Sequence, residues 1–377
     1  MAFRLPRWGE LSEEQMDIVN LPTDKDYVIQ GSAGTGKTVM AVYRAAQISR
    51  NKKVLILVYN KPLKMYLSAA LKEPQFDNCE VSTYFAWLNS FYREHMGMSY
   101  PCVNGERFDP DWNEIMKEIQ NVRKYYDHTI IDEAQDFPVE MIRILRQVSR
   151  NITCFVDPNQ AIEANKTDTV DALKELCVEA PRTLSCNYRN TRQICELSKE
   201  YWSGKGRFAN ARAEGAKPQV IRVPESVWSH GLNYEGQNGI IRDLIMQNRE
   251  KNIGIIVNSK NLNATYKSLR NLVGDQVDVE MFKTSSDNNT IDFDRTGVKI
   301  ISFGAMKGLE FDMVILPSFD KVQPTGDAVA DNNRAYVAIT RACRELVILY
   351  FSEEQSSRWV NTMDKLLEHR ELVDWKN

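Results

Sequence analysis

The glycine-rich segment 31–38 constrains the fold of this chain more than any other part of its sequence. It reads GSAGTGKT and agrees with the pattern GxxxxGK(S/T) at every fixed position. The β-branched run 27–30 precedes it and the helical pattern 39–50 follows it, which is the context that this pattern requires. The sequence therefore predicts a strand, a tight loop and a helix in succession.

Such a loop is chemically suited to bind phosphate groups. Its glycines allow the backbone to form a concave nest of N–H groups, and the following helix adds its positive N-terminus. A lysine in this position reaches the β- and γ-phosphates of a nucleotide, while the hydroxyl that follows it holds Mg²⁺. We therefore expect ATP and Mg²⁺ to be bound by Gly34, Thr35, Gly36, Lys37 and Thr38. Glycine-rich turns also occur without a nucleotide, and the loop alone does not separate a motor from a small kinase or a GTPase.

Short β-branched runs alternate with amphipathic, charged stretches along the chain, which favours parallel sheets with helices on both faces. In the first half, strands are predicted at 27–30, 54–59, 129–132 and 152–156, and helices at 39–50 and 139–148. After residue 189 the pattern restarts, with strands predicted at 219–223, 253–257, 277–281, 298–302, 313–316 and 346–350. We therefore predict an α/β protein with two tandem domains, 1–184 and 185–377. A small helical insertion at about 85–125 is predicted in the first domain, with its last helix beginning at Asp109 and Pro110.

Composition narrows the class of protein further. The formal net charge is −3 and the isoelectric point is near 6.0, so no global positive charge indicates a nucleic-acid partner. The seven cysteines include no CxxC pair, and neither a zinc cluster nor a disulfide framework is readable. The longest apolar runs have the length of a strand and are too short to span a bilayer. We expect a soluble, cytoplasmic protein with no membrane partner.

A second segment, 129–136, places two carboxylates at the end of an apolar strand and reads TIIDEAQD. In open α/β sheets, ligands bind at the carboxyl ends of the strands. Asp132 is predicted to act on the metal side and Glu133 to polarise an attacking water. Acidic residues also cap helices, where they complement the helix dipole. Two adjacent carboxylates in a chain with a phosphate-binding loop favour ATP hydrolysis over small-molecule phosphorylation.

Six ordered segments resemble the motifs of superfamily 1 helicases of the UvrD/Rep type. They read LSEEQ (11–15), DEAQD (132–136), FVDPNQAI (155–162), LSCNYR (184–189), ISFGAMKGLEF (301–311) and NRAYVAITRA (333–342). The resemblance covers most of the chain and implies two RecA-like P-loop NTPase domains. It also implies that ATP hydrolysis between them is coupled to stepping along a nucleic-acid strand.

The resemblance assigns roles to further residues. In this family Gln15 would read the adenine edge, Tyr188 would stack on the adenine, and Gln160 would sense the γ-phosphate. Arg189 and Arg341 would reach the phosphate from the second domain as arginine fingers. In the KGLEF segment, the expected nucleotide-binding residues are Gly308 and Glu310.

Contacts to the nucleic-acid strand are predicted at two places. Tyr59 and Asn60 follow the second strand, and Thr83, Tyr84 and Phe85 follow at a suitable distance. Aromatic rings there would stack on bases, and the polar side chains would hold phosphates. The alternative for these aromatics is packing in the core. The family commonly has a histidine in place of Phe85, so the grip on the strand is expected to differ.

Two functions remain open at this point. The first is an ATP-dependent translocase or helicase on single-stranded nucleic acid, with DNA preferred and RNA as the other track. The second is an ATP-driven switch or assembly subunit that regulates a protein partner such as a nuclease. The large accessory insertions of UvrD/Rep helicases are reduced to about 45 residues in the first domain and are missing from the second. Separation of a duplex by this chain alone is therefore not expected.

Overall fold

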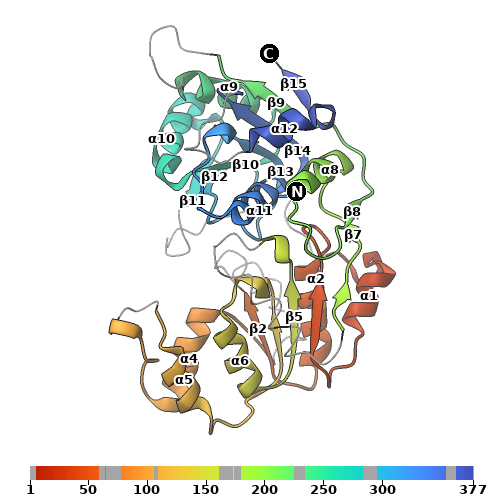
Figure 1. Cartoon of the computed structure of the whole chain (residues 1–377), viewed down its shortest axis with the longest axis vertical. Coiled ribbons are helices and arrows are strands. Elements are labelled where there is room, and N and C mark those ends of the chain that lie inside the picture. The colour runs from red at the N-terminus through yellow and green to blue at the C-terminus, as the bar shows by residue number, and fades with distance from the viewer. Residues whose placement is uncertain are drawn as a thin grey trace. The chain divides into compact units, whose positions relative to one another are not determined.

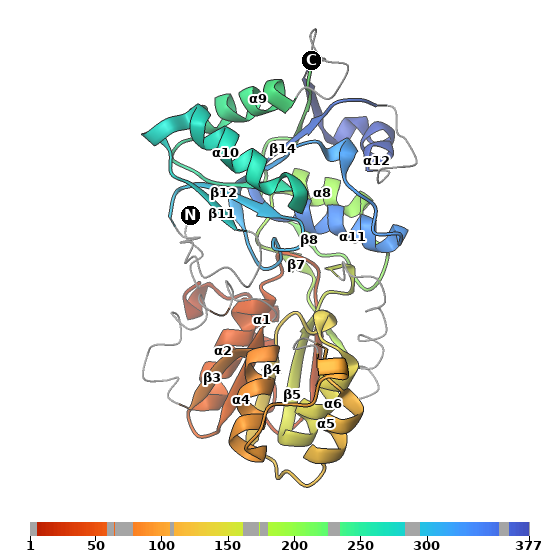
Figure 2. The ribbon, with the colours of Figure 1, turned by 90° about the vertical axis from the view of Figure 1, so that its left-hand side faces the viewer.

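The computed structural model describes residues 6–58, 64, 78–105, 109–160, 173, 180–224, 234–282, 295–353 and 362–376. The described residues form two compact units, the N-terminal unit up to Ser185 and the C-terminal unit from Cys186 onwards. Each unit is built on one main parallel β-sheet with helices packed against it, as Figures 1 and 2 show. The predicted α/β fold with two RecA-like parallel sheets is confirmed. Within the described residues, no helix has both the length and the apolar character needed to cross a membrane.

The sheet of the N-terminal unit has the strand order β3-β2-β4-β5-β1-β6, and all of its pairs are parallel. Its strands are β1 (Tyr27–Gln30), β2 (Val54–Val58), β3 (Cys79–Thr83), β4 (Tyr126–Ile131), β5 (Ser149–Val156) and β6 (Arg182–Thr183). The four strands predicted for this half all form. The sequence did not indicate the two edge strands, because β3 is only partly buried and β6 is two residues long.

Helices cover both faces of this sheet, which explains the continuous apolar runs of its central strands. The helices are α1 (Glu13–Val19), α2 (Lys37–Ser49), α4 (Tyr84–Met96), α5 (Trp112–Ile119) and α6 (Val139–Val148). Successive residues of β2 enter different cores: Leu55 and Leu57 pack with residues of α4, α5 and α6, whereas Ile56 packs with residues of α2. Figure 1 shows α4, α5 and α6 on one side of the sheet and α1 on the other.

The helix predicted to begin at Asp109 and Pro110 begins later, so this part of the prediction is wrong. α5 starts at Trp112, and its N-cap is Asp111, whose carboxylate accepts a hydrogen bond from the Glu114 amide at 3.1 Å. Pro110 instead pairs with Cys102 in an isolated antiparallel bridge. The extended backbone of that bridge excludes Pro110 from the first helical turn.

The sheet of the C-terminal unit has the order β11-β12-β10-β13-β14-β9-β15, again with parallel pairs throughout. Its strands are β9 (Gln219–Arg222), β10 (Asn252–Val257), β11 (Val279–Phe282), β12 (Gly297–Ser302), β13 (Phe311–Leu316), β14 (Ala342–Tyr350) and β15 (Asp374–Lys376). Its helices are α8 (Arg192–Glu200), α9 (Tyr234–Gln247), α10 (Leu262–Val273), α11 (Ala328–Ile339) and α12 (Met363–Glu368), and β7 (Cys186–Asn187) pairs separately with β8 (Asn210–Ala211). All six strands predicted for this half form.

A buried arginine anchors the chain just before the first strand. Arg44 on α2 is fully buried, and burial lowers the pKa of its guanidinium to about 10. Its Nη1 donates to the Leu21 carbonyl at 2.9 Å, its Nη2 to the Pro22 carbonyl at 3.0 Å, and its Nε to Thr153 Oγ1 on β5 at 3.0 Å. This one side chain therefore ties the end of α1, the entry to β1 and the neighbouring strand together.

We predict that Arg44→Ala destabilises the N-terminal unit severely. Truncation leaves buried carbonyls without a donor, at a cost of about 1–3 kcal/mol each, so the total loss should be about 3 kcal/mol or more. The free energy of unfolding from urea titration measures this. Arg50→Ala, at the exposed end of the same helix, is the matched control. A loss below about 1 kcal/mol for Arg44→Ala would show that the network does not stabilise the fold.

Candidate nucleotide-binding site

The predicted phosphate-binding loop connects β1 directly to α2. Two of its glycines, Gly34 (φ 77°) and Gly36 (φ 85°), adopt left-handed backbone conformations that favour glycine. At Gly36, a Cβ atom would also lie 2.6 Å from Nε2 of Gln15, so a side chain there would displace the end of the Gln15 side chain. The local sequence thus explains both the tight turn and the N-terminal start of α2 at Lys37.

Lys37 lies over this loop and bonds to it. Its Nζ donates to the carbonyls of Gly31 at 3.0 Å and Ser32 at 3.2 Å, and the side chain is buried. The ammonium group is therefore positioned within the loop that its own helix follows. A phosphate bound in the loop would face a cation as well as the helix N-terminus.

Thr38 and Asp132 form the contact that links the two predicted halves of the site. The Thr38 hydroxyl donates to Oδ2 of Asp132 at 2.7 Å. Burial and the neighbouring Glu133 raise the pKa of Asp132, while the Thr38 hydrogen bond and Lys37 act in the opposite direction. A hydroxyl and a carboxylate held this close form an oxygen donor set that fits Mg²⁺, which prefers a few protein oxygens together with phosphate and water.

Glu133 is held by a relay of hydrogen bonds that the sequence analysis did not identify. It is buried and has a left-handed backbone (φ 53°), which is uncommon for a residue with a side chain. Gln135 Nε2 donates to Glu133 Oε2 at 2.7 Å, and Gln135 Oε1 accepts from the Asp157 amide at 3.0 Å. Gln135 thus positions the Glu133 carboxylate relative to the end of β5. Both relay residues lie inside motifs already noted, and only the folded contact reveals their function.

Gln160 belongs to the same cluster. It lies in a single turn of 3₁₀ helix, Pro158–Gln160, and its Nε2 donates to Asp157 Oδ2 at 2.8 Å. Burial raises the pKa of Asp157, and the positive charge of Lys37 and the bond from Gln160 lower it. The predicted γ-phosphate sensor is therefore one hydrogen bond away from the relay that holds Glu133.

Gln15 contacts the phosphate loop directly. Its Nε2 donates to the Thr35 carbonyl at 3.2 Å. Its Oε1 accepts from the Ser12 amide at 3.1 Å, within a capping box that begins α1. The motif thus couples the start of α1 to the loop, and the predicted contact with adenine stays a prediction.

The residues predicted to contact a nucleic-acid strand are only partly described. Tyr59 and Asn60 lie outside the described residues. Thr83 is the N-cap of α4, and the Tyr84 and Phe85 rings lie 3.9 Å apart (centroid to centroid). Both rings are partly buried and pack against the core that contains Trp87. Core packing therefore accounts for part of the aromatic pattern in this segment.

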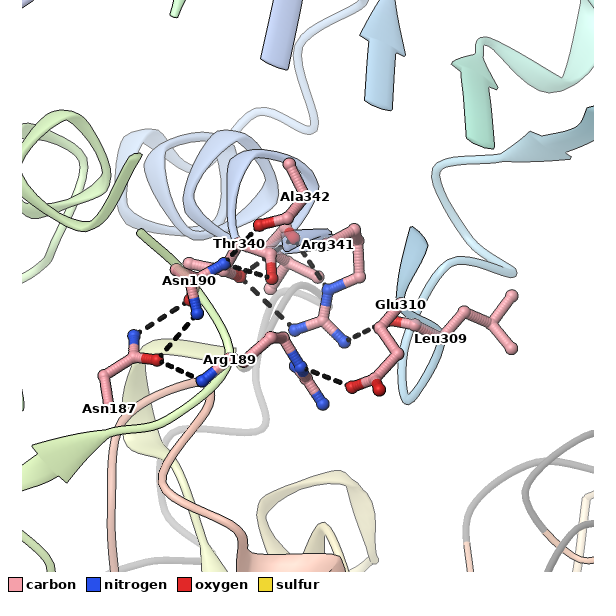
Figure 3. Close-up of polar contacts among 9 residues, drawn as sticks. Asn187, Arg189, Asn190, Leu309, Glu310, Thr340, Arg341 and Ala342 are labelled. Carbon is pink, nitrogen blue, oxygen red and sulfur yellow. Dashed lines mark hydrogen bonds and ion pairs between the residues drawn. The ribbon is translucent and has the colours of Figure 1, made fainter. Parts of the chain in front are cut away.

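In the C-terminal unit, Arg189 is paired with Glu310, as Figure 3 shows. Arg189 Nε lies 2.7 Å from Glu310 Oε2. The backbone of Arg189 is fixed by Asn187, whose Oδ1 accepts from the Arg189 amide at 3.0 Å. Tyr188 is 50% exposed, and Gly308 has a left-handed φ of 75° at the turn before Glu310. Both residues of this ion pair were predicted to act on the nucleotide.

Arg341 lies deep in the same unit and bonds to its backbone. The residue is only 1% exposed. Its Nε donates to the Val337 carbonyl at 2.9 Å. Its Nη1 donates to the Leu309 carbonyl at 3.2 Å, as Figure 3 shows. Arg341 thus joins the end of α11 to the segment that carries Glu310. Its predicted role as an arginine finger stays a prediction, and the bonds described here are structural.

Comparison with known proteins gives matches along most of the chain. A family model described as "Schlafen group 3, DNA/RNA helicase domain" matches residues 25–219, and a model for the UvrD-like helicase C-terminal domain matches residues 241–353. The search of the curated proteins finds no match.

Solved structures with similar folds include the C-terminal domain of a possible DNA helicase from Lactobacillus plantarum. The identity is 19%, over 51% of this chain and 100% of that one, with a TM-score of 0.36. The Arterivirus nonstructural protein 10 helicase in complex with DNA is 14% identical over 94% of this chain and 65% of that chain, with a TM-score of 0.43. A further crystal structure of the Arterivirus nonstructural protein 10 helicase is 14% identical over 90% of this chain and 61% of that chain, with a TM-score of 0.42. The present chain thus spans less than two thirds of the Arterivirus helicase.

The two arginines should respond differently to truncation. We predict that Arg341→Ala lowers the unfolding free energy of the C-terminal unit by about 3 kcal/mol, because it leaves buried carbonyls unpaired. Arg189→Ala removes a partly exposed ion pair and should cost roughly 1 kcal/mol. Thermal unfolding of both variants measures the difference. Equal shifts would contradict a structural role for Arg341.

Proposed function

We propose that this chain, which belongs to the family of Schlafen group 3 DNA/RNA helicase domains, is an ATP-hydrolysing translocase or helicase that acts on single-stranded nucleic acid, preferably DNA. Family membership and the UvrD-like C-terminal match make it a nucleic-acid helicase domain that uses a nucleoside triphosphate. The choice of ATP, of Mg²⁺ and of a single-stranded DNA track is our proposal.

The 2.7 Å hydrogen bond between Thr38 and Asp132 is the observation that carries this proposal. This bond joins Thr38, which follows the phosphate-binding Lys37, to the carboxylate of Asp132, which directly follows β4. In the sheet, β4 lies two positions away from β1, the strand that leads into the phosphate loop. The adjacent Glu133 is held by Gln135, so a metal-side carboxylate and a base are fixed next to each other. This combination supports hydrolysis of a nucleotide.

Each residue of the N-terminal unit has a defined task in this proposal. Thr38 and Asp132 would hold Mg²⁺, which neutralises charge on the phosphates when bound. Lys37 would exchange its bonds to the loop carbonyls for bonds to the β- and γ-phosphates. Glu133 would accept a proton from the attacking water, and Gln160 would respond to the γ-phosphate.

The C-terminal unit would respond to the same phosphate. We propose 1–184 as the ATP-binding domain and 185–377 as the domain with the arginine fingers. Arg189 would leave Glu310 to reach the phosphate, and Arg341 would give up its bonds to the Val337 and Leu309 carbonyls. An arginine finger typically accelerates hydrolysis by a factor of about 10³–10⁵. Loss of the phosphate would then release the domains, a hinge motion of the kind that drives stepping.

One observation favours the second function, an ATP-driven switch that regulates a protein partner such as a nuclease. The Tyr84 and Phe85 rings contact each other at a tilt and pack against the core, so part of the aromatic surface expected to hold bases is used for packing. A chain that hydrolyses ATP at one rate with and without any single strand, and that co-purifies with a stoichiometric protein, would have this second function.

The proposed function predicts hydrolysis stimulated by single-stranded oligonucleotides. The variant Glu133→Gln should still bind ATP, but its turnover rate should fall by a factor of about 10²–10⁴, because the substitution removes the base and leaves the phosphate loop intact. Lys37→Ala should abolish turnover. The measurement is ATPase rate against concentration of single-stranded DNA or RNA, with binding followed by a fluorescent ATP analogue. Glu140→Gln on α6 is the matched control and should behave as the unmodified chain.

Normal hydrolysis by Glu133→Gln would reject the assigned base. Absence of stimulation by either DNA or RNA single strands would reject the track while leaving the nucleotide site in place. Substrates with 5′ and 3′ single-stranded tails then give the polarity of movement and the extent of duplex separation.

A further inference from the structure

A basic hollow lies on the N-terminal unit, lined by residues of α6 and of the segments beside it, none of which belongs to the candidate nucleotide-binding site. It has a volume of about 620 Å³, and the residues that line it are Lys124, Arg143, Arg146, Gln147 and Arg150. Four of these five side chains are cationic and none is acidic. In a chain with a formal net charge of −3, this is a local excess of positive charge, although Asp26 and Asp127 pair with two of the four cations.

The hollow lies at the edge of the sheet opposite to the nucleotide site. Lys124 precedes the first residue of β4, Arg150 is the second residue of β5, and Arg143 lies on α6, which leads into β5. The lining residues therefore lie near the amino ends of β4 and β5. The phosphate loop follows the carboxyl end of β1, which pairs with β5 in parallel. The two sites therefore have separate residues and separate faces.

Two of the cations are explained by the fold itself. Arg146 Nε lies 3.0 Å from Asp26 Oδ2, and its Nη1 donates to the Arg150 carbonyl at 2.9 Å, where it complements the C-terminal end of α6. Lys124 donates to the Arg146 carbonyl. Burial and the charge of Arg146 lower the pKa of Lys124, which shows that cations are crowded here.

The other two cations are available to a ligand. Arg143 is exposed, and among the described residues no side chain or carbonyl forms a hydrogen bond or ion pair with its guanidinium group. Arg150 contacts Asp127 through Nε at 3.2 Å, and its side chain is 69% exposed. One guanidinium edge of Arg150 thus stays turned to solvent. Guanidinium groups match phosphate oxygens in a bidentate geometry.

The chemistry of the lining distinguishes between classes of polyanion. Sites for single-stranded nucleic acid combine cations with aromatic side chains that stack on the bases. Among the residues that the structure describes, no aromatic side chain lines this hollow. It also lies open, with exposed cations at its rim, whereas sites for small ligands bury most of the ligand surface. A polymer that offers phosphates outward and keeps its bases paired inside fits this lining.

We propose that Lys124, Arg143, Arg146 and Arg150 form a second nucleic-acid contact, which binds the phosphodiester backbone of a duplex without reading its sequence. Arg143 and Arg150 make the phosphate contacts, and Arg146 and Lys124 supply positive potential from fixed positions. This contact rests on the proposed function only in that the ligand is nucleic acid. It binds the duplex independently of ATP, at the edge of the sheet opposite to the nucleotide site.

The test measures binding of short blunt-ended duplexes, one of DNA and one of RNA, by fluorescence anisotropy at several salt concentrations. Each phosphate contact contributes about −0.9 to the slope of log K against log salt for a DNA duplex. Arg143→Ala combined with Arg150→Ala should therefore reduce the magnitude of the slope by about 1.8 and weaken duplex binding. ATPase stimulation by single-stranded oligonucleotide should stay unchanged. The pair Arg242→Ala and Arg249→Ala, on a partly exposed and an exposed arginine of the C-terminal unit, removes the same charge and should change neither measurement.

Arg143→Glu alone keeps the contact between Arg150 and Asp127, so it tests the hollow even where the double variant loses stability. It should weaken duplex binding as well. No duplex binding by the unmodified chain, or an unchanged salt slope in the variants, would overturn the proposal. A parallel loss of single-strand stimulation would overturn the claim of a separate contact, because the hollow would then belong to the track. Failure of stimulation in the unmodified chain rejects the proposed motor function and leaves the duplex measurement to decide on the hollow.

Discussion

The hydrogen bond between the Thr38 hydroxyl and the Asp132 carboxylate depends on the strand order of the N-terminal sheet. β1 and β4 are not neighbours, because β5 pairs with both of them in parallel. Since all three strands run in the same direction, their carboxyl ends meet at one edge, and the loop after β1 comes close to the residues after β4. The left-handed conformations of Gly34 and Gly36 then place the start of α2 directly at that edge. The remaining groups of the site are held relative to this one contact.

Glu133 shows how the same edge fixes orientation as well as position. Its left-handed backbone directs the chain into a short turn of 3₁₀ helix, Ala134–Asp136, instead of a continued strand. Gln135 in that turn then connects the Glu133 carboxylate to the backbone after β5. A strained residue of this kind persists only where its surroundings determine its conformation, and such residues are concentrated at functional sites. The relay therefore joins the ends of β4 and β5 into one unit around the site.

Much of the fold and of this site could be predicted from the sequence, for identifiable reasons. Central strands buried on both faces have continuous apolar runs, and the phosphate loop requires glycines at fixed positions. The edge strand β3 was not predictable, because its partial burial weakens the apolar pattern. The start of α5 was predicted two residues early, because the pair Asp109 and Pro110 resembles a helix start although Asp111 is the N-cap. Gln135 could be recognised as part of a motif but not as a support for Glu133, since that depends on a contact with Asp157. The basic hollow combines Lys124 with the stretch 143–150, and the net charge of the whole chain does not reveal it.

Arg341 illustrates why a motif alone does not define the state of a side chain. The TRA segment identifies this arginine, and the fold buries it against the Val337 and Leu309 carbonyls. Arg189 is bonded to Glu310, the residue after Leu309, so both arginines contact the same short segment. A change at that segment would therefore act on both guanidinium groups together. Because buried carbonyls are costly to leave unpaired, Arg341 can reach a phosphate only if the segment around Leu309 moves with it or gains other donors. The coupling between nucleotide and domain movement would then lie in the backbone of this segment as much as in the arginines themselves.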